Sequence, residues 1–171
     1  MKTYAIIATA ALALAACNPA STDTTETQAA TTETADATAF TPQDLSTLIA
    51  AMGPDAALAE LFRDPADARW TTALAGISGG DLAWIAAVAP LVPVLDGEAA
   101  ESGFSAYGDA LTSQPEAVLA AVGADGMAST CQPYPPETIE AKQSALAAIS
   151  DESPVVALRD ECLTTLSGEP T

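Results

Sequence analysis

Alanine is the residue that most limits how this chain can fold, since it supplies 40 of the 84 hydrophobic residues. The larger apolar residues Leu, Ile, Val and Phe number only 33 among 171 residues, and the net charge is −18. This combination lies at the border where chains stay disordered. Each buried alanine removes little apolar surface from water. A folded core is therefore expected only where the larger residues are concentrated.

The first 16 residues predict a signal peptide. A lysine at position 2 precedes an apolar stretch, residues 4–16, which is too short to span a bilayer. The stretch ends in Leu14-Ala15-Ala16-Cys17, which resembles the lipobox of bacterial lipoproteins: an aliphatic residue, two small residues and a cysteine. The resemblance covers only these 17 residues. It implies that Cys17 receives a diacylglyceryl group, that the leader is removed, and that the new amino group is acylated.

The resemblance also implies a location. Several acyl chains on Cys17, at ~0.8 kcal/mol per buried methylene, would anchor the protein permanently in the membrane of a bacterial cell envelope. Asn18 stands where an aspartate retains lipoproteins in the inner membrane in sorting of the enterobacterial type. The outer membrane is therefore favoured, with the rest of the chain in the periplasm or at the cell surface. The alternative is an ordinary signal peptide with cleavage of the Ala-x-Ala type and a free cysteine.

Residues 17–39 predict a tether that begins at the acylated cysteine. Residues 18–39 hold eight Thr, six Ala and four acids, but no Leu, Ile, Val, Phe or basic residue. Such a segment cannot bury apolar surface, so we expect it to be disordered, with a root-mean-square reach of ~25 Å. The alternative is a modified, Thr-rich stalk.

Residues 40–171 predict one α-helical domain. They hold 29 of the 33 larger apolar residues and all ten glycines, which suffices for a modest core. A capping residue followed by proline recurs at 41–42, 64–65 and 153–154, and residues 78–81 and 113–116 fit capping boxes. No segment alternates as a strand would. We expect an all-α fold: a compact, irregular array of about seven to eight short helices in antiparallel pairs, with one disulfide.

The expected helices lie near residues 42–52, 54–62, 65–76, 79–89, 98–112, 114–122, 136–150 and 154–167. The glycines expected to stop helices are Gly53, Gly76, Gly123 and Gly168. Residues expected in the core are Trp70, Trp84, Ile85 and Val88, with the stripes Ala100, Phe104, Tyr107, Leu111 and Val155, Leu158, Cys162, Leu166. Pro90 is expected to end or kink its helix.

Two cysteines remain after Cys17, and an even pair in an exported chain predicts a disulfide between Cys131 and Cys162. The alternative is a redox-active or metal-binding pair of thiols. The chain has no Cys-x-x-Cys spacing and no histidine to complete a zinc site, so the structural bond is favoured.

Histidine is absent from the chain, which excludes Ser-His-Asp and Cys-His catalysis and every metal site built on imidazole. We expect no catalytic residue, no metal ligand set and no cofactor. Residues 76–80 match the Gly-x-Ser-x-Gly pattern of hydrolases. They fall between two predicted helices, however, so we expect them to end the first helix rather than to carry a nucleophile. A Ser–Lys pair would have to use Lys142, and no Ser-x-x-Lys precedes it.

The charge of the chain indicates which classes of partner it can bind. The acidity argues against nucleic acid, since neutralising phosphates needs Lys and Arg. Four acids cluster at predicted helix starts, where they complement the helix dipole: Asp81, Asp96, Glu98 and Glu101. The few bases are expected to pair locally, for instance Arg63 with Asp67.

Tyr134 is the candidate binding residue. It lies in Cys131-Gln132-Pro133-Tyr134-Pro135-Pro136, where three prolines and the expected disulfide would stiffen the chain around an amphipathic ring. The alternative is a stiff connector whose tyrosine lies flat on the domain.

The leading hypothesis for the function of the chain is a lipid-anchored, non-enzymatic module that binds a protein partner. The alternatives are a histidine-free carboxylate enzyme acting on a cell-wall component, and a structural or solubilising envelope protein.

Overall fold

Helices alone build the part of the chain that the computed structural model describes, residues 39–168. The predicted all-α class is confirmed, as is the number of helices. The α-helices are α1 (Pro42–Met52), α2 (Pro54–Leu61), α3 (Ala68–Ser78), α4 (Leu82–Val88), α5 (Gly97–Ala110), α6 (Pro115–Thr130), α7 (Ile139–Ala147) and α8 (Val156–Ser167). Short 3-10 helices span Pro65–Asp67, Ala89–Val94 and Pro136–Thr138. The proposed leader, tether and Cys17 lie outside the described residues, except for position 39.

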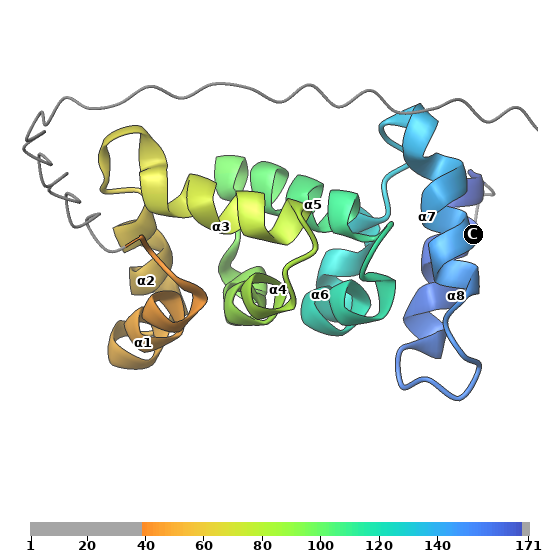
Figure 1. Cartoon of the computed structure of the whole chain (residues 1–171), viewed down its shortest axis with the longest axis horizontal. Coiled ribbons are helices and arrows are strands. Elements are labelled where there is room, and N and C mark those ends of the chain that lie inside the picture. The colour runs from red at the N-terminus through yellow and green to blue at the C-terminus, as the bar shows by residue number, and fades with distance from the viewer. Residues whose placement is uncertain (1–38, 169–171) are drawn as a thin grey trace, which may run out of the picture. The chain divides into compact units, whose positions relative to one another are not determined.

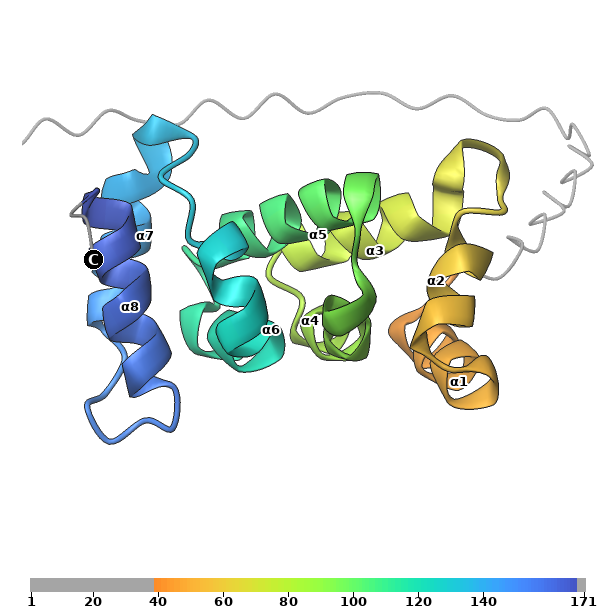
Figure 2. The same ribbon diagram turned by 180° about the vertical axis from the view of Figure 1, so that it is seen from behind.

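The helices form two layers flanked by a helix pair at each end (Figure 1, Figure 2). One layer consists of α3 and α5 side by side, and the other consists of α4 and α6. At one end α1 packs on α2 and α4, and at the other end α7 and α8 pack together as an antiparallel pair, with α8 also against α6. Consecutive helices such as α1 and α2 or α7 and α8 pack together, but both layers are formed by helices that are not consecutive along the chain.

Several helix ends follow the sequence signals. Thr41 starts α1 with a complete capping box: its Oγ1 accepts a hydrogen bond from the Asp44 N–H (3.2 Å), and the Asp44 carboxylate accepts from the Thr41 N–H (2.9 Å). Gly53 and Gly168 stop α1 and α8 with positive φ of 83° and 70°. Helix α4 ends at Val88, directly before the proline-containing 3-10 helix, as expected for Pro90.

The two capping boxes predicted from the sequence, at residues 78–81 and 113–116, are wrong. Ser78 is the last residue of α3, and the reversal through two glycines leaves Asp81 to cap α4, where its carboxylate accepts from the Ala83 N–H at 2.8 Å. At residues 113–116 the capping position is Gln114, which makes no side-chain cap bond. Glu116 instead accepts a hydrogen bond from the Ser153 hydroxyl at 2.6 Å, so a contact with a distant residue replaces the local one.

The stop expected at Gly123 is confirmed locally, and the one at Gly76 is wrong. Gly123 takes a non-helical conformation with a positive φ of 59° and divides α6 into two helical segments, but the second segment follows directly and runs to Thr130. The second half of α6 buries Gly126 and Met127, and this packing maintains it. Gly76 lies inside α3, which continues to Ser78. The expected start of α3 near residue 65 is also displaced, because the 3-10 turn Pro65–Asp67 precedes it.

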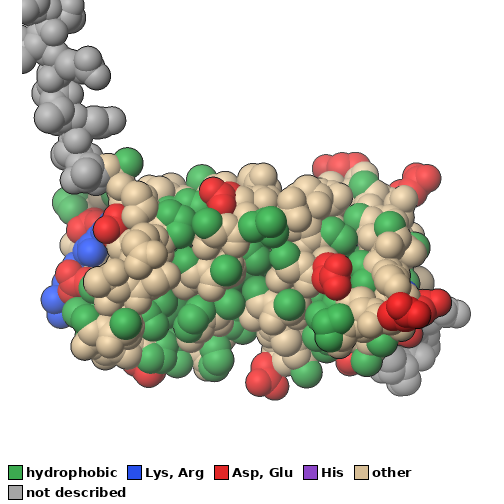
Figure 3. All heavy atoms as spheres, turned by 60° about the horizontal axis from the view of Figure 1, so that its bottom comes forward, with side chains coloured by type: hydrophobic (Ala, Val, Ile, Leu, Met, Phe, Trp, Pro, Cys, Tyr) green, Lys and Arg blue, Asp and Glu red, His purple; other side chains and the backbone are tan. Residues whose placement is uncertain are grey.

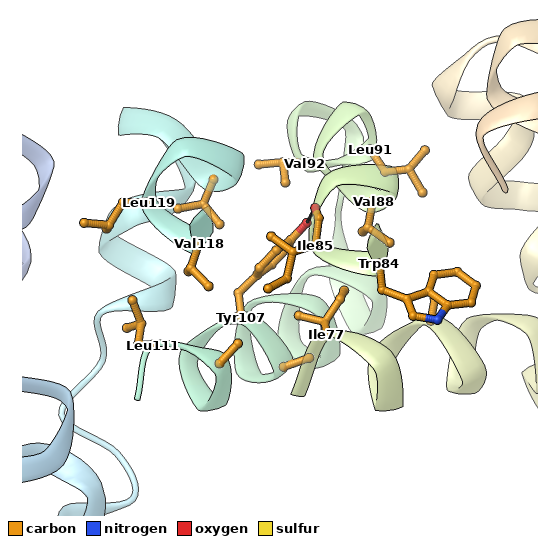
Figure 4. Packing of buried hydrophobic residues seen from close by; sticks show 14 of the residues in the cluster. Ile77, Trp84, Ile85, Val88, Leu91, Val92, Tyr107, Leu111, Val118 and Leu119 are labelled. Carbon is orange, nitrogen blue, oxygen red and sulfur yellow. Dashed lines mark hydrogen bonds between the residues drawn. The ribbon is translucent and has the colours of Figure 1, made fainter. Parts of the chain in front are cut away.

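The core places large side chains from several helices around Tyr107, as Figure 4 shows. Tyr107 is fully buried and points from α5 toward α4, where its hydroxyl donates to the Ile85 carbonyl oxygen at 3.2 Å. Burial raises the pKa of this hydroxyl above its ordinary value. Both tryptophans are buried, and Ile85 and Val88 are in the core, as predicted.

Glycines make room for aromatic rings between the helices. A Cβ added at Gly76 of α3 would lie 2.0 Å from the Trp84 ring of α4, and one at Gly126 of α6 would lie 2.8 Å from the Phe104 ring of α5. A Cβ at Gly103 would be 3.5 Å from Trp70. An alanine-rich core has few large side chains, and packing each ring directly on a glycine backbone lets those few fill the space between helices.

Candidate functional site

A cavity with a volume of about 620 Å³ lies where α5, the end of α6 and α7 meet. Its remaining wall is the 131–135 loop, the connection between α6 and the 3-10 helix that precedes α7. The residues that line it are Ala100, Glu101, Phe104, Ser105, Gly108, Asp109, Ser129, Thr130, Gln132, Tyr134, Pro135 and Lys142.

Helix α5 supplies one wall through two stripes with a spacing of four residues. The stripe of Ala100, Phe104 and Gly108 is small or apolar, and the parallel stripe of Glu101, Ser105 and Asp109 is polar. Of the stripe expected on the core face of α5, Tyr107 and Leu111 are fully buried, whereas Ala100 and Phe104 are only half-buried and line the cavity, with Phe104 also packed against the core. The buried residues of α5 are Ala99, Gly103, Ala106, Tyr107, Gly108 and Ala110. A helix with an apolar residue on most of its sides does not reveal from its sequence which side faces the centre.

The predicted disulfide is present and fixes one end of the 131–135 loop. Cys131 and Cys162 are fully buried, with an S–S distance of 2.02 Å and a Cα–Cα distance of 5.4 Å. The bond connects the end of α6 to the middle of α8. Cys162 lies on the inner stripe of α8, with Val155 and Leu166, as the sequence predicts.

Hydrogen bonds hold the rest of the loop. The Lys142 ammonium donates to the Tyr134 carbonyl oxygen at 2.8 Å, and the Thr138 hydroxyl donates to the Pro135 carbonyl oxygen at 2.8 Å. The Gln132 side chain donates to the Ala128 carbonyl oxygen at 3.1 Å. The side chain of Tyr134 nevertheless stays in solvent, with 74% of the residue exposed, so it does not lie flat on the domain.

Lys142 is the functional candidate that the sequence did not reveal. Only 2% of this residue is exposed, and its side chain enters the cavity wall from α7. Burial lowers the pKa of its ammonium, while the nearby negative charge of Asp109 acts in the opposite direction. An isolated lysine in an amphipathic helix usually reaches solvent, and only the tertiary structure shows that α5 and the loop cover this one.

Thr130 is a second buried polar group at the cavity. It is 2% exposed, and its hydroxyl oxygen has no hydrogen-bond partner within the described residues. Buried hydroxyl groups are nearly always hydrogen-bonded, because desolvation without a partner is unfavourable. Besides the Lys142 ammonium, the residues that line the cavity therefore include a buried hydroxyl group that no described residue binds.

The three arginines of the described chain all pair with carboxylates. Arg63 contacts Glu60 at 2.6 Å, Arg69 pairs with Asp64 and Glu60, and Arg159 pairs with Asp151 and Asp160. The predicted pairing of Arg63 with Asp67 is wrong. Asp67 takes a left-handed backbone conformation in the turn before α3, whereas Glu60 lies three residues from Arg63, at the end of α2.

Acidic side chains are spread over the face in Figure 3, on which basic side chains are visible only at one end, among acids. The acids singled out in the sequence do not gather at the main cavity. Asp81 caps α4, and only Glu101 of that group lines the cavity. Asp96 and Glu98 line a second cavity, of about 460 Å³, together with Asp55, and all three are exposed.

The Gly-x-Ser-x-Gly segment has a packing role. It forms the last turn of α3 and the reversal into α4, with Gly76 against Trp84 and Gly80 against the Ser113 side chain.

Within residues 39–168, no group of three or more Cys, Asp or Glu side chains is arranged to hold a metal ion. Among the described helices, none is both long and apolar enough to cross a membrane. No protein-family model, curated protein or solved structure shows significant similarity to this chain.

Proposed function

We propose that this chain is a lipid-anchored protein of a bacterial envelope whose helical domain binds a cationic protein partner around Tyr134. The observation that carries the binding part is the exposure of Tyr134 on a loop held by a disulfide and by hydrogen bonds. The anchor rests on the lipobox resemblance at Cys17.

The restrained loop favours binding for an energetic reason. Ordering a flexible loop at an interface costs conformational entropy. The 131–135 loop is already ordered by its contacts, so a partner that packs on Tyr134 avoids most of this cost. Tyrosine also supplies a large apolar ring with a polar tip, which is why it is common among residues that dominate binding.

The sign of the partner's charge follows from composition. Residues 40–171 hold 19 acids and four bases, a net charge of −15. The three arginines are engaged by carboxylates and the lysine is buried, so the exposed field of the domain is strongly negative. Such a field speeds association with a cationic surface and slows it for an anionic one.

Photo-crosslinking in intact cell envelopes tests the binding surface. Tyr134 is replaced by p-benzoylphenylalanine in one variant, and Leu82, which is 54% exposed at the start of α4, is replaced in a matched control. We expect a discrete crosslinked product from position 134 that is absent from position 82 and that weakens as salt is added. Identical products from both positions, or none from position 134, would contradict the proposed surface.

Metabolic labelling tests the anchor. Wild-type chain produced in a bacterium supplied with a palmitate analogue is expected to carry the label, and a Cys17→Ala variant is expected to carry none, because the thioether and the new amino terminus both depend on this cysteine. The measurement is in-gel detection after extraction of free lipid. An unlabelled wild type would overturn the lipoprotein assignment and favour an ordinary signal peptide.

A further inference from the structure

The cavity beside Tyr134 contains two buried polar groups whose hydrogen bonding the protein leaves incomplete. A lysine ammonium has three donors, and within residues 39–168 only the Tyr134 carbonyl oxygen accepts from Lys142. The Thr130 hydroxyl has no partner there at all. Both residues are 98% buried and both line the cavity. The ammonium therefore keeps two donors, and the Thr130 hydroxyl keeps one, that no described residue uses.

The Lys142 ammonium and the backbone of Thr130 approach the same part of the cavity wall, next to Gly108 of α5. A Cβ added at Gly108 would lie 3.1 Å from the Thr130 carbonyl oxygen and 3.8 Å from the Lys142 Nζ. The glycine thus allows the ammonium and the end of α6 to approach the same point of the α5 backbone. A larger residue at position 108 would separate them.

The ammonium also lacks a counter-charge at contact distance. Each arginine in the described part has a carboxylate within 4.0 Å, whereas Lys142 forms no ion pair by this criterion. Asp109 favours the charged form only from a distance, and it is exposed. A buried charge without a partner is unfavourable, and a carboxylate brought by a ligand would remove that penalty.

The walls restrict the rest of the ligand. The cavity volume of about 620 Å³ lies within the range of small-molecule sites. Phe104, Ala100 and Pro135 present apolar surface, so they fit an apolar body. Glu101 and Asp109, both exposed on α5, repel every anion, and this repulsion grows with the number of negative charges on the ligand. The combination selects a single carboxylate attached to an apolar group.

We propose that this cavity binds a small amphipathic monocarboxylic acid. Its carboxylate accepts hydrogen bonds from Lys142 and Thr130, and its apolar body packs on Phe104 and Pro135 below Tyr134. This inference does not rest on the proposed protein partner, because it is argued from Lys142, Thr130 and the cavity walls rather than from the exposed ring of Tyr134.

The test compares matched probes on the full chain in detergent by isothermal titration calorimetry. The acids run from phenylacetate to 5-phenylpentanoate, and each is paired with its uncharged amide. We expect at least one acid to bind with a dissociation constant below about 10 mM, and its amide to bind at least about tenfold more weakly, because hydrogen bonds to a charged group are the stronger ones.

Two variants distinguish the loss of a ligand contact from a loss of folding. Thr130→Val removes a hydroxyl that has no internal partner, so it should leave the thermal midpoint unchanged or raised, yet weaken the acid severalfold. Lys142→Met should weaken the acid at least about tenfold, with the amide little affected. Equal binding of acid and amide would overturn the carboxylate assignment. Failure of every acid to bind, or unchanged affinity in both variants, would overturn the site itself.

Discussion

Replacing both Cys131 and Cys162 by alanine is expected to lower the free energy of unfolding by about 3–4 kcal/mol. The two cysteines are 31 residues apart, and the bond removes the conformational entropy of that loop from the unfolded chain. A small domain typically has a total stability of ~5–15 kcal/mol. The loss is large on this scale, so the midpoint of thermal or urea unfolding should fall markedly.

The structure also predicts which helices lose stability first when the disulfide is removed. The disulfide connects α6 to α8, and α7 packs on α8, so the bond secures the terminal helix pair. Hydrogen exchange of the double variant should therefore rise in α7 and α8 before it rises in α3 and α4. Reduced wild type serves as the control and should match the variant. Two free thiols in the unreduced, exported protein would refute the prediction.

Adding a single methyl group at position 76 should lower the free energy of unfolding almost as much as removing the disulfide. In a helix, alanine is ordinarily more stable than glycine by about 1 kcal/mol, so propensity predicts that Gly76→Ala stabilises the domain. The structure predicts the opposite, since the new Cβ would lie 2.0 Å from the Trp84 ring. Overpacking of this kind costs about 1–3 kcal/mol or more. We expect a net loss of roughly 2 kcal/mol or more, measured by urea unfolding.

Two controls identify the cause. Thr71→Ala changes an exposed position of the same helix and should alter stability by less than about 0.5 kcal/mol. Combining Gly76→Ala with Trp84→Leu should lose less stability than the sum of the two single changes, because the smaller side chain relieves the clash. Strict additivity, or a stabilised Gly76→Ala, would show that the ring does not rest on the glycine.

The extent to which the site was predictable differs from residue to residue. The Cys131–Cys162 bond follows from an even cysteine count, and the stiff segment around Tyr134 follows from its prolines, because both signals are local or depend on simple pairing. The cavity does not follow, since Lys142 and Thr130 come from different helices and are covered by a third. Nothing in the residues around Lys142 indicates that it is buried.

The sequence by itself determined the helical class, most helix ends and the disulfide. The helix ends depend on contacts between near neighbours: Thr41 and Asp44 are three residues apart, and Gly53 stops a helix through its own backbone freedom. The disulfide joins distant residues, but the even number of cysteines after Cys17 leaves only one pairing. The tertiary structure alone decided which glycines stop a helix and which accept an aromatic ring, as Gly76 accepts Trp84. It also decided which face of α5 turns inward. In a chain rich in alanine, periodicity leaves several faces of a helix such as α5 nearly equivalent. The face that turns inward is then decided by the few large side chains, which must pack against other helices.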